Sequence, residues 1–175
     1  MGKSQALQMS VHAAVSSTSL IALTCDNTLS NEKYEKVKKT VLKLHKDVLE
    51  YNKKLLILEA DYSSIQKHRV AKHADELNAD MSSSFKRIPH QNGGEDVIKK
   101  NETTKVEKDN LKKAIKISLE VRKVAQAIEK IGYRLTKIGD KNMHADARTA
   151  IHLAHASSKS ALENIKVVKK ELAKI

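Results

Sequence analysis

Several residue types that most folds need are scarce in this chain of 175 residues. It contains no Trp, one Pro and five Gly, and only 3% of its residues are aromatic. Sandwiches and barrels of β-strands depend on aromatic side chains in their strands and on Gly and Pro in their turns, so this composition argues against both. The apolar residues are mostly Leu, Ile, Val and Ala, with abundant Lys and Glu beside them. This mixture is typical of helix bundles.

Cysteine is also nearly absent. The single Cys25 excludes an internal disulfide and any cysteine-rich zinc site, which fits a reducing compartment and predicts a cytoplasmic protein. The run LIALTC at residues 20–25 weakly resembles a lipoprotein cleavage box, so an exported basic lipoprotein remains an alternative. No apolar run approaches the roughly 20 residues of a membrane span, and none is predicted.

Positive charge, by contrast, is in excess. The chain has 33 Lys and Arg against 21 Asp and Glu, a formal charge of +12. Such an excess attracts anionic partners. The lysines are spread along the chain with few aromatic residues between them, so specific binding of nucleic acid is not predicted. Zinc-protease and paired-cysteine motifs are missing, and the helical stripes lack the core carboxylates of di-metal bundles, so no metal site is predicted either.

Apolar residues recur at steps of three and four over most of the chain, which indicates amphipathic helices. Four helical segments are predicted, at about residues 10–25, 31–82, 104–138 and 142–172. The second carries the clearest seam, from Tyr34 to Ile65, and we expect Leu42, Leu49 and Leu56 to widen it toward other helices. The polar residues Asp26, Asn27, Thr28, Ser30 and Asn31 are expected to end the first helix and to cap the second. The run GDKN at residues 139–142 is expected to form the turn between the third and fourth helices.

The expected fold follows from these segments. It is all-α, an antiparallel bundle of four to five helices with one very long second helix. Pro89 and the pair Gly93 and Gly94 place a loop at about residues 87–102. Nothing else suggests a boundary, so residues 1–175 are expected to form a single domain.

Several segments resemble one family of enzymes. The run GDKNMHAD at residues 139–146 and the Ala-rich run at residues 149–156 resemble the Gly-Asn-x-Asn-x-x-Ser-Asp segment and following helix of the cyclodeaminase/cyclohydrolase family. SLEV at 118–121, KRIP at 86–89 and NEKY at 31–34 resemble further family segments in the same order. The agreement extends over nearly the whole chain.

The resemblance implies a function and an assembly. Members of this family act on one-carbon tetrahydrofolates as formiminotetrahydrofolate cyclodeaminases or methenyltetrahydrofolate cyclohydrolases. An anionic folate would be the substrate, no separate cofactor is implied, and the family expectation is a homodimer with sites between helices near the subunit interface.

The resemblance also implies which residues form the site. Asp61 or Asp75 would transfer protons, Asn142 and Asp146 would hold the pterin, and Asp146 is also a candidate catalytic group. The candidates for the remaining substrate contacts are Ser10 in the first helix and, for the glutamate carboxylates, Lys86, Arg87 and Arg148.

Two alternatives stay open beside this interpretation. Asp146 opens a helix, where a carboxylate ordinarily does no more than complement the helix dipole. The family begins its first helix with Gly-Gly-Gly-Ser, whereas this chain has Leu7, Gln8 and Met9 before Ser10. A helical interaction protein without catalysis is therefore the main rival hypothesis.

Overall fold

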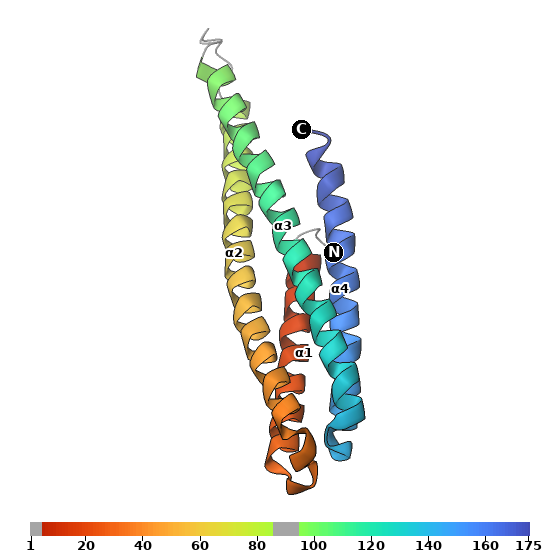
Figure 1. Ribbon diagram of the computed structural model, residues 1–175. Coiled ribbons are helices and arrows are strands. Elements are labelled where there is room, and N and C mark those ends of the chain that lie inside the picture. The colour runs from red at the N-terminus through yellow and green to blue at the C-terminus, as the bar shows by residue number, and fades with distance from the viewer. Residues whose placement is uncertain (1–4, 86–94) are drawn as a thin grey trace.

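The computed structural model describes residues 5–85 and 95–175, except for the side chains of residues 5, 68–70, 72, 73, 75–85 and 95–103. These residues form four α-helices and two short 3-10 helices, with no strand in the two described ranges (Figure 1). The elements are α1 (Gln5–Ser30), η1 (Glu32–Val37), α2 (Lys38–Phe85), α3 (Glu95–Ile138), η2 (Lys141–Met143) and α4 (His144–Leu172). The predicted all-α bundle is confirmed, and α2 is its longest helix with 48 residues.

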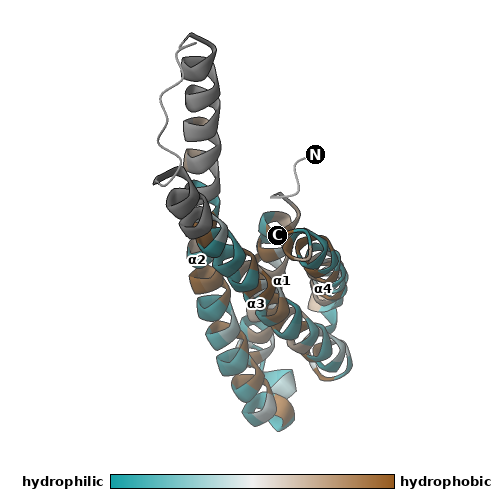
Figure 2. Cartoon of the chain, turned by 90° about the horizontal axis from the view of Figure 1, so that it is seen from above, coloured by the Kyte–Doolittle hydropathy of each residue, from teal (hydrophilic) through white to brown (hydrophobic). Residues whose placement is uncertain are grey.

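Helix α1 is the central element of the bundle. It packs against α2, α4 and, less extensively, α3, while α3 packs against α4 and α2. Helices α2 and α3 run side by side beyond the ends of the two shorter helices (Figure 1), and the view from above shows the four helices around a common core (Figure 2). The groove described below lies between α2 and α3.

The core is aliphatic, as the periodicity predicts. The seam of α2 is buried at Val41, Leu44, Val48, Leu55, Tyr62 and Ile65. The expectation for Leu42, Leu49 and Leu56 is wrong, because these side chains are 43–50% exposed. They lie on the edge of the helix rather than on the side that α1 and α3 cover.

Gly132 allows three helices to approach one another. A Cβ atom at this position of α3 would lie 2.6 Å from Cγ1 of Ile151 in α4 and 3.3 Å from Cδ1 of Ile21 in α1. The first distance is shorter than real Cβ contacts, so any side chain here would force Ile151 to shift. Glycine is therefore the residue that lets α3 pack closely on both neighbours.

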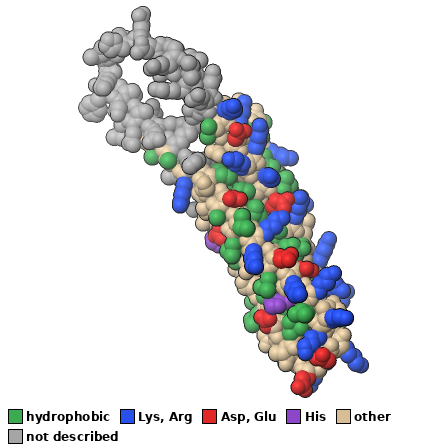
Figure 3. All heavy atoms as spheres, turned by 60° about the vertical axis from the view of Figure 1, so that its left-hand side comes forward, with side chains coloured by type: hydrophobic (Ala, Val, Ile, Leu, Met, Phe, Trp, Pro, Cys, Tyr) green, Lys and Arg blue, Asp and Glu red, His purple; other side chains and the backbone are tan. Residues whose placement is uncertain are grey.

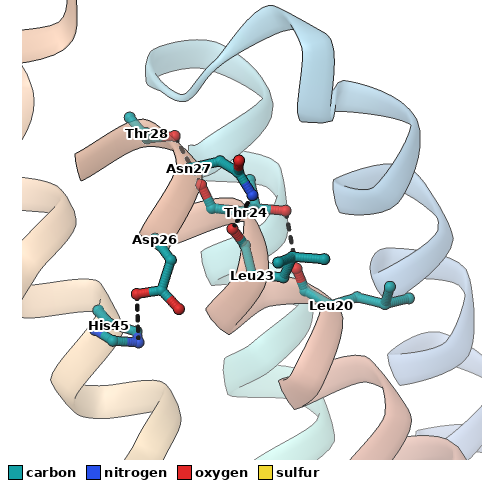
Figure 4. A network of polar contacts seen from close by, with 7 residues as sticks. All are labelled: Leu20, Leu23, Thr24, Asp26, Asn27, Thr28 and His45. Carbon is teal, nitrogen blue, oxygen red and sulfur yellow. Dashed lines mark hydrogen bonds and ion pairs between the residues drawn. The ribbon is translucent and has the colours of Figure 1, made fainter. Parts of the chain in front are cut away.

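Two predicted boundaries are wrong. Helix α1 continues to Ser30, because the side chains expected to end it bond to their own helix (Figure 4): Asn27 donates to the Leu23 carbonyl at 2.9 Å and Thr28 to the Thr24 carbonyl at 2.8 Å. Helix α3 begins at Glu95, so residues 95–102 of the predicted loop are helical.

Among the described residues, one helix bears on the expectation that no membrane span is present. By length and composition, residues 6–30 could cross a membrane. In the bundle, however, α1 packs against all three of the other helices. Cys25 lies fully buried within it, and burial, with a smaller contribution from the Asp26 carboxylate, raises the pKa of its thiol to about 12. Cleavage before this residue, which the lipoprotein alternative requires, would remove most of a core helix.

Candidate functional site

A groove between α2 and α3 is the candidate functional site. Its volume is about 410 Å³, within the range of pockets that hold small ligands. It is lined by Leu58, Asp61, Ser64 and Ile65 of α2 and by Asn110, Lys113, Lys116, Ile117 and Glu120 of α3. One predicted catalytic residue, Asp61, is therefore in a groove.

The groove has an apolar floor and a charged rim. The side chains of Ile65 and Ile117 are only 7% and 6% exposed, and they form part of the floor. Asp61, Lys113 and Lys116 are exposed at the rim. A flat ring could rest on such a floor while the rim groups orient its polar substituents.

Glu120 anchors one wall of the groove. Its Oε2 accepts from Lys54 Nζ of α2 at 2.6 Å, and its Oε1 accepts from Lys123 Nζ of α3 at 2.8 Å. The bonds from Lys123 and Lys54 lower the pKa of this carboxyl to about 2. Glu120 is therefore ionised at neutral pH and links α2 to α3 beside the groove.

Asp61 differs from Glu120 in its surroundings. Its carboxylate forms no hydrogen bond or ion pair with the side chains that the structure describes, and it is solvent-exposed. A ligand in the groove could therefore contact it without displacing an existing partner. Of the two carboxylates, Asp61 is the one available for chemistry.

The predicted motif at residues 139–146 lies at the end of the bundle where α3 turns into α4. The buried Asp140 is its centre: Oδ1 accepts from the Asn142 backbone N–H at 2.9 Å and Oδ2 from Asn31 Nδ2 at 2.9 Å. Its own N–H donates to Thr28 Oγ1 at 2.9 Å. The bonds from Asn142 and Asn31 lower the pKa of the Asp140 carboxyl. This network closes the bundle end and confirms the predicted turn.

Three predicted site residues follow that turn. The side chain of Asn142 is exposed in η2, Asp146 is half-buried in the first turn of α4, and Arg148 is exposed two residues later. None of them lines the groove.

Asp61 and Asp146 are separated along the bundle axis. Glu59 pairs with His12, two residues from Ser10, and Ser10 contacts Ser157 of α4, so Asp61 lies near the level of Ser157. Asp146 is eleven residues before Ser157 on the same helix, which is about 16 Å at the rise of an α-helix. One copy of the chain therefore does not gather the two carboxylates into one site.

Ser10 is part of a helix contact. Its hydroxyl donates to the Ser157 carbonyl at 2.7 Å, and the Ser157 hydroxyl donates to the Ser10 carbonyl at 2.7 Å. Both residues are almost fully buried. Two small side chains thus join α1 to α4 by reciprocal bonds, with no space for a ligand between them.

The remaining predicted positions lie outside the described part of the chain. Lys86 and Arg87 fall between its two ranges, and the side chain of Asp75 is outside it as well. Among the side chains that are described, no three His, Cys, Asp or Glu residues come together as metal ligands would.

Comparison with known proteins identifies the family. Residues 9–172 match the formiminotransferase-cyclodeaminase family. The chain belongs to this family. The search of curated protein sequences found no match to this chain.

A solved structure shows the cyclodeaminase-family fold. Formiminotetrahydrofolate cyclodeaminase from Thermotoga maritima superposes with a TM-score of 0.67, covering 95% of this chain and 70% of the other. The two sequences are 18% identical. At that identity the match shows a common fold, and it agrees with the resemblance found in the sequence.

Within this cyclodeaminase-family chain, sequence reasoning missed the α3 side of the groove. Lys113, Lys116 and Glu120 are spaced by three and four residues, which places them along one side of a helix. Glu120 also lies in the segment SLEV that carries part of the family resemblance. The spacing of these three residues, next to a segment that resembles the family, could have indicated this side of the groove.

Proposed function

We propose that this member of the formiminotransferase-cyclodeaminase family binds a one-carbon tetrahydrofolate in the α2–α3 groove and interconverts the one-carbon group. Family membership and the likeness to a formiminotetrahydrofolate cyclodeaminase support the reaction class. The observation that carries the proposal is an available carboxylate, Asp61, on the rim of an apolar groove that also presents two lysines.

The groove suits a molecule with a flat ring and an anionic tail. The pterin would rest on the floor near Ile65 and Ile117. Lys113 and Lys116 would attract the carboxylates of the glutamate tail, because an ammonium group binds a carboxylate by charge-assisted hydrogen bonds.

Asp61 would serve both reactions of the family by moving a proton. In cyclodeamination, a substrate nitrogen attacks the formimino carbon, the bond from that carbon to the departing nitrogen breaks, and ammonia leaves with a proton. In cyclohydrolysis, water adds to the amidinium carbon, loses a proton, and a carbon–nitrogen bond of the bridge opens. A positioned carboxylate can accept the first proton and return it to the leaving nitrogen.

The proposal does not give every other predicted site residue a role in the groove. Asp146, Asn142, Arg148 and Ser10 are not on the helices that line the groove, so we expect no direct contact with a ligand held there. Asp75, Lys86 and Arg87 remain predictions.

Three broader expectations are also part of the proposal. The folate is the substrate, with no further cofactor required. The chain works in the cytoplasm, and it pairs with a second copy of itself.

The test pairs two Asp→Asn substitutions on α2. Asp61→Asn should lower the rate of ammonia release from formiminotetrahydrofolate, or of methenyl-bridge opening, by about 10²- to 10⁴-fold, as loss of a general base does. Asp47→Asn, on the same helix but outside the groove, should leave both rates unchanged.

Calorimetric titration with 5-formyltetrahydrofolate separates binding from catalysis. Lys113→Gln with Lys116→Gln should weaken binding, whereas Asp61→Asn should leave it nearly intact. Full activity in Asp61→Asn would overturn the catalytic assignment. Saturable binding without turnover by the parent chain would support the non-catalytic rival instead.

A further inference from the structure

The hairpin of α3 and α4 exposes charge of one sign. Residues 121–162, all of which lie in the described part of the chain, include eight Lys and Arg against three acids. None of these acids is exposed, because Glu129 and Asp146 are half-buried and Asp140 is buried. Seven of the eight basic residues are exposed. Their surface, which we call the basic face, consists of Lys123, Lys130, Arg134, Lys137, Lys141, Arg148 and Lys159.

On α3 the exposed lysines form a straight row. Lys123, Lys130 and Lys137 are separated by seven residues, nearly two turns, which places them along one side of the helix at intervals of about 10 Å. Glu120 contacts α2, and Glu129, two and a half turns later and therefore on the opposite side, contacts α4. Because the three lysines are exposed, their row lies on the side of α3 that neither helix covers.

The basic residues of α4 run beside this row. His155 Nδ1 lies 3.2 Å from Glu129 Oε1 of α3, which identifies the side of α4 nearest to α3. Arg148 lies seven residues before His155, and Lys159 lies four residues after it, so both are on that side. Cations that are spread along the sequence are thus brought onto one surface by the hairpin.

Most of the basic face has no anionic partner within the described part of the chain. Lys123 pairs with Glu120 at 2.8 Å. The other six residues of the face form no ion pair with the residues that the structure describes. Exposed cations without a partner attract a polyanion, and a regular row of them suits one whose charges repeat at short intervals.

We propose that the basic face binds single-stranded nucleic acid without regard to sequence. The phosphates of such a strand would meet several of the cations at once, and each contact releases counterions. Tyr133 is 53% exposed and lies three residues after Lys130 and four before Lys137, so it stands beside both. An aromatic side chain among cations is a platform on which an unpaired base stacks. In a duplex the faces of the bases are covered, so Tyr133 favours a single strand.

The composition of the basic face argues against a lipid surface as its partner. Helices that lie on membranes combine basic residues with a continuous apolar side. Within residues 121–162, Tyr133 is the one large apolar side chain that is exposed. Figure 3 shows Lys and Arg side chains (blue) gathered toward one long edge of the described part of the chain.

The basic face is separate from the α2–α3 groove. None of its seven residues lines the groove. The inference therefore does not rest on the proposed folate chemistry, and loss of folate binding or turnover would leave it standing.

The test of the cations uses two pairs of lysines with the same spacing. Fluorescence anisotropy measures the affinity for a fluorescein-labelled thymidine oligonucleotide of about 20 nucleotides. Lys130→Gln with Lys137→Gln should weaken binding about tenfold at 0.1 M salt and reduce the slope of log affinity against log salt by about 1.4, since two phosphate contacts are lost. Lys46→Gln with Lys53→Gln, exposed on α2 on either side of the exposed Glu50, removes the same charge and should change neither value appreciably.

The test of stacking uses two exposed apolar side chains of α3. Tyr133→Ala should weaken binding about fivefold or more, as loss of one stacked base does. Leu119→Ala, at a side chain that is 41% exposed, should leave the affinity unchanged. Circular dichroism should show the same helicity in the parent chain and all four variants.

Several results would overturn the proposal. They are the absence of saturable binding by the parent chain at 0.1 M salt, equal losses in the two lysine pairs, and full affinity in Tyr133→Ala. Tighter binding to a duplex of the same length, to vesicles of phosphatidylserine and phosphatidylcholine, or to poly-glutamate would likewise overturn it and assign the basic face to that partner.

Discussion

Helices α1 and α3 show opposite ways of building an exposed helix in one bundle. In α1 the polar residues are mainly Ser, Thr, Asn and Gln, and several bond within their own helix: Thr24 donates to the Leu20 carbonyl and Ser19 to the Val15 carbonyl. In α3 the polar residues are mainly Lys, Arg and Glu. A side chain whose hydrogen bonds are satisfied locally tolerates being covered, whereas an ammonium group requires water or an anion.

This difference gives the two sides of the molecule different surface chemistry. The α1 side can be covered by protein, and the α3 side, with Lys113 and Lys116 on the groove rim, can meet an anionic ligand. The net charge of +12 alone does not make that distinction. Its distribution over the helices does.

The largest effect should follow a change in the core of α1. Ile21 is fully buried between α3 and α4, so Ile21→Ala should lower the free energy of unfolding by about 2–5 kcal/mol through lost burial and the remaining cavity. Lys130→Ala, exposed on α3, should change it by less than about 0.5 kcal/mol. Urea unfolding monitored by circular dichroism measures both. Similar losses in the two variants would contradict the placement of the core.

A smaller loss of stability, which depends on pH, is expected when Glu120 on α3 is changed. Glu120→Gln removes the bonds to Lys54 and Lys123, and because these groups are partly exposed to solvent the loss at pH 7 should be only about 1 kcal/mol. The pKa of Glu120 in the folded chain is depressed, so its contribution is present above the ordinary value of 4.5 and disappears as the pH falls toward 2.

The melting temperatures of the parent chain and of Glu120→Gln, followed from pH 7 to pH 2, test whether the contribution of Glu120 to stability is lost in acid. The gap between them should be widest near neutrality and close in acid. Glu50→Gln, an exposed acid on α2 that forms no ion pair with the described residues, is the control and should open no such gap.

The sequence predicted the seam of α2 and the turn at Gly139 because both depend on local periodicity and capping. It misplaced Leu42, Leu49 and Leu56, since periodicity identifies an apolar side of a helix without telling how much of that side the neighbours cover. It also ended α1 too early. Asn27 and Thr28 can cap a new helix or bond back to their own, and packing of α1 against three helices favours the second outcome.

The site was predicted only in part for a similar reason. Asp61 stood out beside the seam of α2, but Asn110, Lys113 and Lys116 lie some fifty residues later, and only the pairing of α2 with α3 brings them to it. Asp146 stood out equally in the family-like segment. Its distance from the groove follows from the level at which α4 begins, which spacing along the chain does not encode.

The smallest expected effect on stability concerns Asp146. Asp146 lies in the first turn of α4, at the end of the bundle where α3 turns into α4, and its carboxylate is placed to complement the positive end of the helix dipole. Asp146→Asn should therefore cost about 0.3–1 kcal/mol in thermal or urea unfolding. Because neither α4 nor Asp146 lines the groove, calorimetric affinity for 5-formyltetrahydrofolate should be unchanged, whereas substitution of Lys113 and Lys116 should weaken it. Loss of affinity in Asp146→Asn at unchanged stability would move the folate site to the α4 end of the bundle and separate it from the α2–α3 groove.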